Sequence, residues 1–313
     1  MTDSRRNIVE SMLEKLESEY KNLTSDEKTL SQMYEEIEEK SKEIQYDYRV
    51  ARDLTNVMRN RYCNILPTES SRFKSENLPY INASLVKDKY ILTQGPLSSY
   101  INEFWTMVWD SNADTIVCLT NQYENTRSKF DSYFNDKMQE GYKQYTVKVN
   151  NIIKHDGYNL VVRSIQLTKY DVSYKSDPFN LNEIEIVMSN EQVRLINHIQ
   201  YTGWPDHGLP ADVNEFLKIL QVLDEVTNRK NPLIIHCSAG VGRTGTLTVV
   251  LEILDMIKSV LAFNTEGIVE PDKIDIPNLI INLRQYREGL VQSDEQFEFC
   301  YLAVIEGIKM LLS

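Results

Sequence analysis

The most informative stretch of this sequence is HCSAGVGRTG, at residues 236–245. The apolar run LIIHC at 233–237 leads into it and is typical of a buried strand. Residues 243–260 are predicted to form a helix. Two glycines, Gly240 and Gly242, allow the loop between strand and helix to curl with its N–H groups pointing inward. Such a loop at a helix N-terminus binds a tetrahedral oxyanion, so we expect an anion site here.

Two reactive side chains frame this expected anion site. Arg243 carries a planar guanidinium that can hold two oxygens of a phosphate group at once. Cys237 begins the loop, where the inward N–H groups and the helix terminus favour its thiolate. A thiolate beneath a bound phosphate is placed for in-line attack. The alternative is an inert, buried cysteine, and the surroundings of Cys237 argue against it.

A second segment, YTGWPDHG at residues 201–208, offers the acid that such a reaction needs. The departing oxygen of a phosphate ester must receive a proton, and Asp206 can supply it. Glycine and proline bound this loop, which predicts that it closes over a substrate and excludes water. The alternative is an aspartate that only makes a turn.

Together these two segments resemble the classical tyrosine-specific protein phosphatases, whose nucleophile lies in a Cys-x5-Arg loop. Five other segments of that family stand in the expected order, and the resemblance covers about residues 45–310. They are NRYCNILP (60–67), YINAS (80–84), TQGPL (93–97), FWTMVW (104–109) and GLVQSDEQ (289–296). A Cys-x5-Arg loop alone is a moderately specific signal, whereas this ordered set is highly specific.

The resemblance implies a role for each matching position. Catalytic roles fall to the nucleophile Cys237, the phosphate-binding Arg243, the acid Asp206, the water-orienting Gln292, and the thiolate-tuning His236 and Thr244. Substrate-binding roles fall to Tyr62, Asn64, Ser238, Ala239, Gly240, Val241, Gly242, Arg243, Gln292 and Gln296. Supporting roles fall to Glu124, which holds the arginine, to Lys129, which meets the acid, and to the hinge residue Trp204.

Two positions bear on the substrate. Tyr62 is expected to wall a deep pocket, in which the phosphate of a long phenyl phosphate reaches Cys237 and that of a phosphoserine does not. Asn64 stands where several members of the family carry an acid, which leaves peptide preference open. Glu124 and Lys129 rest on weaker local motifs, and the alternative for both is a solvated surface charge.

The expected activity is hydrolysis of phosphotyrosine in proteins, in two steps through a cysteinyl-phosphate. No metal or cofactor is expected, because Arg243 and the loop amides supply the electrostatic stabilisation. One rival is a silent module that binds phosphotyrosine peptides without turnover, although the cysteine, arginine and acid are all present. A second rival is a dual-specificity or lipid phosphatase, which usually lacks the NRY segment.

Composition sets the wider limits. Among 313 residues, 42% are hydrophobic, which suffices for a sizeable core, and the net charge is −12. A chain this acidic is a poor candidate for binding nucleic acid. The four cysteines form no CxxC pair, the first residues do not resemble a signal peptide, and no run of about 18 apolar residues predicts a membrane span. We expect a cytoplasmic enzyme, while a domain of a larger receptor stays possible.

The expected fold is α/β, a single domain with a twisted mixed central sheet flanked by helices, at residues 45–313. Residues 1–44 form a helical N-terminal segment that packs on the catalytic body or, alternatively, contacts a partner or a second copy. Helical periodicity extends over 5–57, and Thr24 with Glu27 predicts a helix start. Hairpin turns are predicted at Asp156-Gly157 and Ser189-Asn190. Ser293 with Gln296 predicts the start of the last helix.

Overall fold

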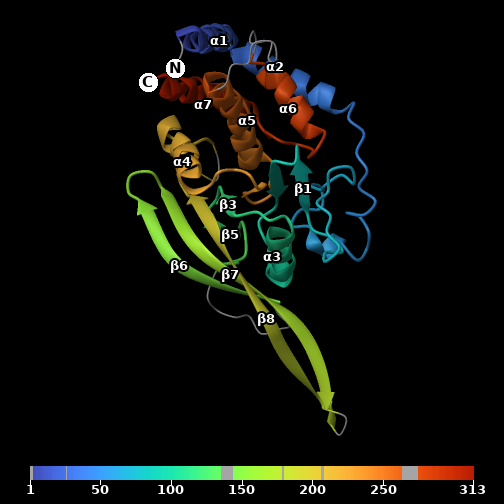
Figure 1. The fold of residues 1–313 in the computed structure, drawn as a ribbon. Helices are drawn as coiled ribbons and strands as arrows, with labels where there is room; N and C mark the ends of the chain where they lie inside the picture. The colour runs from blue at the N-terminus through green and yellow to red at the C-terminus, as the bar shows by residue number, and fades with distance from the viewer. Residues whose placement is uncertain (1–2, 26, 135–143, 178–179, 206–207, 263–273) are drawn as a thin grey trace.

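A seven-stranded mixed sheet forms the centre of the computed structural model, which describes residues 3–25, 27–134, 144–177, 180–205, 208–262 and 274–313 (Figure 1). Its strand order is β1 (Ala83–Val86), β2 (Tyr90–Thr93), β9 (Leu233–His236), β3 (Thr115–Cys118), β8 (Asn180–Tyr201), β7 (Leu160–Asp177) and β6 (Tyr145–His155). The pairs β2–β9, β9–β3 and β3–β8 are parallel and the other pairs are antiparallel. The predicted mixed sheet is confirmed.

Strand β9 lies inside the sheet and is buried on both faces. Ile235 faces the larger hydrophobic cluster, and Ile234 faces the smaller one. A short strand with apolar residues on both faces buries all of them only when a layer covers each face of the sheet. This requirement explains why LIIH forms a central parallel strand. Its carboxyl end delivers Cys237 to the edge of the sheet, between the ends of β2 and β3.

Helices cover both faces of the sheet (Figure 1). The larger cluster joins the sheet to α4 (Val213–Val226), α5 (Gly242–Ala262), α6 (Ile276–Arg284) and α7 (Asp294–Leu312). The smaller cluster joins the other face to α3 (Ile101–Asp110). Short elements complete the chain: the 3-10 helices η1 (Val57–Arg59) and η2 (Ser98–Tyr100), and a hairpin of β4 (Tyr123–Glu124) with β5 (Arg127–Ser128). Among the described residues, none of these helices has the length and apolar character that crossing a bilayer requires.

The predicted hairpin at Asp156-Gly157 is confirmed. His155 at the end of β6 pairs with Leu160 at the start of β7, and Gly157 in the turn between them has a φ of +82°. Only glycine adopts such a φ without strain, which is why this dipeptide is a strong turn signal.

The predicted hairpin at Ser189-Asn190 is wrong. These residues lie within β8: Lys169 of β7 pairs with Gln192 and Asp171 pairs with Ser189, so the register shifts between them. Asn190 has a φ of +52°, and its side-chain amide donates to Asp171 Oδ2 at 2.8 Å. An asparagine with positive φ suits a β-bulge as well as a turn, so the local signal was ambiguous. Both strands continue beyond the bulge and extend away from the body (Figure 1).

The N-terminal helices α1 (Asp3–Thr24) and α2 (Glu27–Ser41) begin and end differently from the expectation. Thr24 is the last residue of α1, and its hydroxyl donates to the Tyr20 carbonyl at 2.9 Å, so it does not cap α2. The prediction of helix over residues 5–57 is wrong for the stretch after Ser41. Only Val57, the last residue of that range, is helical again, because η1 begins there. The backbone there is bound to the body, since the Asp47 N–H donates to Thr68 Oγ1 at 3.0 Å. By contrast, the capping of α7 by Ser293 is confirmed.

The apolar stripe of α1 and α2 is buried against the rest of the chain. Val9, Met12 and Leu16 on α1 are at most 3% exposed and belong to the same cluster as the core of α5 and α7. The Tyr20 ring stacks on Tyr301 of α7 with centroids 6.0 Å apart. Helices this short gain most of their stability from such packing, so α1 and α2 are structural parts of the body.

We therefore predict that Leu16→Ala lowers the free energy of unfolding of the full chain by about 2 to 5 kcal/mol, because it removes buried side-chain volume. Urea unfolding followed by tryptophan fluorescence measures this difference. The matched control is Glu14→Ala, an exposed position on the same helix. Equal unfolding midpoints for the two variants would show that α1 does not pack as described.

Candidate active site

The loop between β9 and α5 forms a cup around the sulfur of Cys237. Two donors reach Sγ: the Gly240 N–H and the Thr244 hydroxyl, both at 3.3 Å. Cys237 is 5% exposed. Gly240 has a φ of +75°, and a Cβ there would collide with the Thr93 carbonyl of the neighbouring strand. The position thus requires glycine, and the resulting curl turns its N–H toward the sulfur.

Arg287 fixes the outer side of this loop. Its Nε donates to the Gly240 carbonyl at 2.8 Å, and its Nη2 donates to the Ala239 carbonyl at 3.0 Å and to Asn82 Oδ1 at 2.8 Å. The side chain is completely buried, and burial lowers its pKa to about 10, so it stays charged at neutral pH. With its carbonyls bound from behind, the loop presents its N–H groups to the cup. Sequence analysis missed Arg287, whose surroundings in RQYREGL look like a solvated turn.

Arg243 is held by a bidentate ion pair with Glu124. The distances are 2.7 Å from Nη1 to Oε1 and 2.9 Å from Nη2 to Oε2. Thr120 Oγ1 donates to the same carboxylate at 2.7 Å, so Glu124 is itself fixed. The structure brings these two residues together as the resemblance implied. Lys129 joins them, with its Nζ 3.5 Å from Glu124 Oε2.

The segment expected to carry the acid is anchored at both described ends. Trp204 is buried, its ring packs against Phe216 and Phe299, and its indole N–H donates to the Gly208 carbonyl at 3.0 Å. The Pro205 carbonyl accepts from Arg243 Nη2 at 2.9 Å. Asp206 lies outside the described residues, and so does its expected meeting with Lys129.

Tyr62 stands at the mouth of the cup. Its hydroxyl lies 2.8 Å from Ser238 Oγ, and the residue is 37% exposed to solvent. The preceding Arg61 fixes the segment, donating to the Gly95 and Pro96 carbonyls at 3.0 and 2.8 Å. Cys63 and Asn64 follow Tyr62 in the sequence, and both are exposed. Cys118 and Cys300 are buried.

Gln292 and Gln296 cover the start of α5. A Cβ added to Gly242 would lie 2.9 Å from Gln292 Oε1 and 3.1 Å from Gln296 Nε2. The Gln292 backbone N–H donates to Gln296 Oε1 at 2.9 Å, which ties the Gln296 side chain to the Gln292 backbone. The two amides therefore lie close to Gly242, where the loop that holds Cys237 joins α5.

Behind the loop lies a buried chain of hydrogen bonds that starts at His236. His236 Nδ1 donates to the Cys237 carbonyl at 3.0 Å, so Nε2 of the neutral ring accepts from the Tyr133 hydroxyl at 2.7 Å. The Tyr133 oxygen in turn accepts from His198 Nε2 at 2.7 Å. His198 Nδ1 then accepts from Arg163 Nη1 at 3.3 Å. Every donor meets an acceptor only if both histidines are neutral.

Electrostatics agree with neutral rings. Burial lowers the pKa of His236 to about 4, and burial together with the nearby Arg163 holds the pKa of His198 well below its usual range. His236 thus acts on the loop through its hydrogen bond to the Cys237 carbonyl, without a positive charge at neutral pH.

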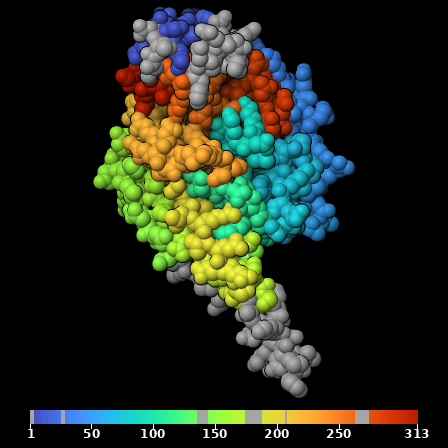
Figure 2. All heavy atoms as spheres, in the orientation of Figure 1, coloured from blue at the N-terminus to red at the C-terminus, as the bar shows by residue number. Residues whose placement is uncertain are grey.

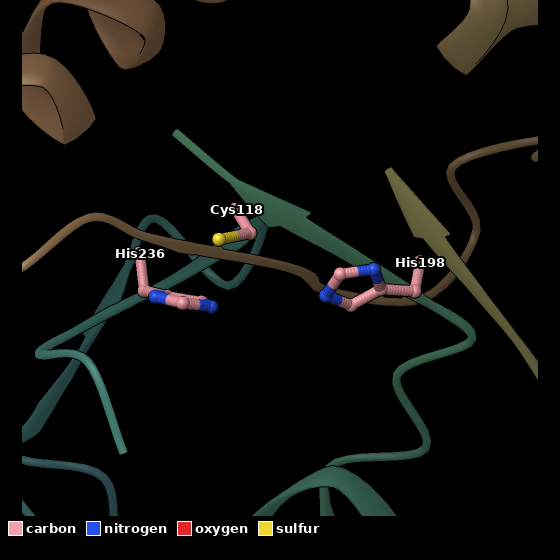
Figure 3. Close-up of side chains that lie close together, drawn as sticks. All are labelled: Cys118, His198 and His236. Atoms are coloured by element: carbon pink, nitrogen blue, oxygen red, sulfur yellow. The ribbon is translucent and has the colours of Figure 1, made fainter. Parts of the chain in front are cut away.

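The same cluster contains a potential set of metal ligands. Figure 3 shows the Cys118 side chain between the rings of His236 and His198, and their ligand atoms lie within 4.8 Å of one another. The donor set does not fit a metal well, because the Tyr133 oxygen already bonds both Nε2 atoms and the Cys118 sulfur donates to the Thr120 carbonyl. Burial also raises the pKa of Cys118 to about 12, which disfavours the thiolate that a metal requires.

The two buried histidines predict a specific pH dependence of stability. An unfolded histidine titrates near 6.5, whereas folded His236 titrates near 4 and burial holds the pKa of His198 well below 6.5. The unfolded chain therefore binds more protons as pH falls from about 6.5 to about 4, so the free energy of unfolding falls through that window. We expect a shallower fall in His198→Gln, which removes one of these groups.

Urea unfolding at pH 7, 6 and 5 measures both slopes. Carboxylates contribute alike to the two proteins, so the difference reports His198. As a control, His155→Gln replaces a histidine at the end of β6, outside the cluster, and should keep the wild-type slope. A His198→Gln slope equal to that of the wild type would contradict a neutral, buried His198.

Comparison with known sequences fits this geometry. Residues 56–306 match the family described as protein-tyrosine phosphatase. Since the match covers most of the chain, the chain belongs to the protein-tyrosine phosphatase family.

Several curated proteins are similar over most of this chain. Tyrosine-protein phosphatase 2 of Dictyostelium discoideum is 36% identical over 74% of this chain and 56% of its own length. Tyrosine-protein phosphatase non-receptor type 2 of Homo sapiens is 35% identical over 89% of this chain and 62% of its own length. A protein-tyrosine-phosphatase of Arabidopsis thaliana is 32% identical over 86% of this chain and 76% of its own length. The chain thus spans little more than half the length of the first two relatives.

Proposed function

We propose that this protein hydrolyses phosphotyrosine in proteins, with Cys237 as a covalent nucleophile. The observation that carries the proposal is the pair of donors on Cys237 Sγ, one from the Gly240 N–H and one from the Thr244 hydroxyl. Donors aimed at a sulfur stabilise its anion. The clamped guanidinium of Arg243 beside the same loop supplies the charge that a phosphate needs.

In the first step, the thiolate of Cys237 attacks phosphorus and the bond from phosphorus to the tyrosine oxygen breaks. The leaving oxygen takes a proton from Asp206. Arg243 and the loop N–H groups bind the equatorial phosphate oxygens, where charge gathers in the transition state. The two hydrogen bonds to the Glu124 carboxylate fix the orientation of the guanidinium, so the arginine need not reorganise during the reaction.

In the second step, water attacks the cysteinyl-phosphate. Gln292, with Gln296 bonded to its N–H, places the water, and Asp206 takes its proton. The phosphorus–sulfur bond breaks, and the sulfur leaves as a thiolate stabilised by Thr244 and the Gly240 N–H. The chemistry balances with water and the phosphate ester alone, so the proposal includes no metal and no cofactor.

Substrate choice follows from the mouth of the cup. The Tyr62 ring, bonded through its hydroxyl to Ser238, makes a wall that a phenyl phosphate can stack against. Phosphotyrosine-containing proteins are the proposed substrates. We place the reaction in the cytoplasm, because all four cysteines are free and a reactive thiol persists in a reducing compartment.

Cys237→Ser tests the nucleophile. We expect it to abolish hydrolysis of p-nitrophenyl phosphate, measured by release of p-nitrophenolate, because a serine hydroxyl is not ionised at neutral pH. The matched control is Cys63→Ser, an exposed cysteine next to Tyr62, which should keep wild-type turnover. Chelator should change neither rate. Wild-type turnover by Cys237→Ser would refute the mechanism.

Peptide substrates test the specificity. We expect phosphotyrosine peptides to be hydrolysed far faster than matched phosphoserine peptides. Tyr62→Ala should lower kcat/KM for phosphotyrosine peptides by about threefold to tenfold, the loss expected for one aromatic contact. Tyr158→Ala removes a similarly exposed tyrosine from the turn between β6 and β7 and serves as control. Comparable rates on both peptides would favour a dual-specificity enzyme, and binding without turnover would favour a silent module.

A further inference from the structure

The segment that carries Gln292 contains a strained residue. Val291 has a φ of +61°, a left-handed conformation that a β-branched residue rarely adopts. Such a residue persists only where its surroundings hold it. Its N–H donates to the Val241 carbonyl in the loop of Cys237, at 3.1 Å. Its carbonyl points the other way, and the position of Gln292 depends on what binds that carbonyl.

Two side chains bind the Val291 carbonyl, and one of them comes from α2. The Tyr34 hydroxyl donates to it at 3.0 Å, and Arg284 Nη2 donates at 2.8 Å. Arg284 Nε also donates to the Leu290 carbonyl at 2.9 Å. Burial raises the pKa of Tyr34, so its hydroxyl keeps the proton that it donates.

Helix α2 also fixes Arg284 itself. Arg284 is 2% exposed, and its Nη2 donates to Glu38 Oε1 at 2.6 Å while its Nη1 donates to Ser41 Oγ at 3.1 Å. A buried guanidinium needs a compensating charge, and Glu38 provides a carboxylate beside it. Both groups that hold the Val291 carbonyl are therefore set by α2.

A third contact joins α2 to the far end of the same segment. Ser31 Oγ donates to Asp294 Oδ2 at 3.0 Å, in the first turn of α7, and the Tyr34 ring lies 6.2 Å from the Phe297 ring. Gln292 lies between Val291 and Asp294, the two residues that side chains of α2 contact. Helix α2 thus holds the segment before and after Gln292.

We propose that Tyr34 and Glu38 of α2 are positioning residues for hydrolysis of the cysteinyl-phosphate. They act through the Val291 carbonyl and Arg284 on Gln292. The inference rests on the proposed function, in which Gln292 places the attacking water. In the step concerned, the water oxygen bonds to phosphorus, Asp206 takes the proton, and the sulfur departs with the electron pair of the broken phosphorus–sulfur bond. Formation of the cysteinyl-phosphate does not use this water and should not depend on α2.

The test is Tyr34→Phe in the full chain, which removes one hydroxyl and keeps the ring. Rapid acid quench with a phosphate-labelled phosphotyrosine peptide measures the rate constants for forming and for hydrolysing the cysteinyl-phosphate. We expect hydrolysis to slow by about threefold to tenfold, the effect of losing one hydrogen bond, with formation unchanged. The phosphorylated fraction of the enzyme at steady state should rise accordingly.

Tyr20→Phe is the matched control. Tyr20 on α1 also donates one hydrogen bond to α7, but its acceptor, Glu298 Oε1 at 2.9 Å, lies outside residues 289–292. It should leave both rate constants unchanged. Glu38→Gln and Glu39→Gln on the same helix form a second pair. Glu38→Gln should slow hydrolysis of the cysteinyl-phosphate and leave its formation unchanged, and Glu39→Gln should change neither rate constant. Glu39 pairs with Lys42 on the surface.

The outcomes separate the two proposals. Equal slowing of both steps in Tyr34→Phe, or no change relative to Tyr20→Phe, overturns the role of α2, because a purely structural contact would not select one step. A wild-type enzyme that releases phosphate without any cysteinyl-phosphate overturns the proposed function instead.

Discussion

The contact of Arg287 with the carbonyls of Ala239 and Gly240 is the constraint on which the rest of the site depends. A loop that binds an anion must turn its N–H groups inward, which leaves its carbonyls facing a buried interior. Arg287 donates to both carbonyls and to Asn82, so no buried acceptor is left without a partner there. The same guanidinium interacts electrostatically with Cys237. One buried residue thus supports both the shape and the charge of the cup.

Under the proposed function, an acidic chain must bind an anionic substrate, and this local arrangement supplies the donors that it needs. The net charge of −12 opposes long-range attraction of phosphate. Binding must come from short-range donors: the N–H groups of the loop and the guanidinium of Arg243, which Glu124 holds in place. The neutral His236 adds no charge and instead orients the Cys237 carbonyl. In the proposed function, substrate binding and stabilisation of the sulfur anion both therefore depend on short-range contacts.

Local sequence signals were sufficient where one interaction dominates. The β6–β7 turn and the start of α7 were predicted correctly, because a glycine with positive φ and a serine cap each act within a few residues. The same kind of signal failed at Asn190, where positive φ serves a bulge, and at Thr24, whose hydroxyl bonds back into α1. At Asn190 the outcome depends on the pairing with β7, which a short window does not contain, and at Thr24 two local hydrogen-bonding patterns compete within the same few residues.

The sequence by itself determined the chemistry that we propose for this protein. The strand, the two glycines, the cysteine and the arginine lie within thirteen residues, 233–245, so their spacing alone specifies an anion cup with a thiol inside it. Only the tertiary structure decided what holds that cup. Arg287 lies 47 residues from Gly240, Tyr133 lies 103 residues from His236, and Tyr34 lies 257 residues from Val291. Such pairs satisfy buried polar groups across distant segments, and that requirement arises only when the core closes around them.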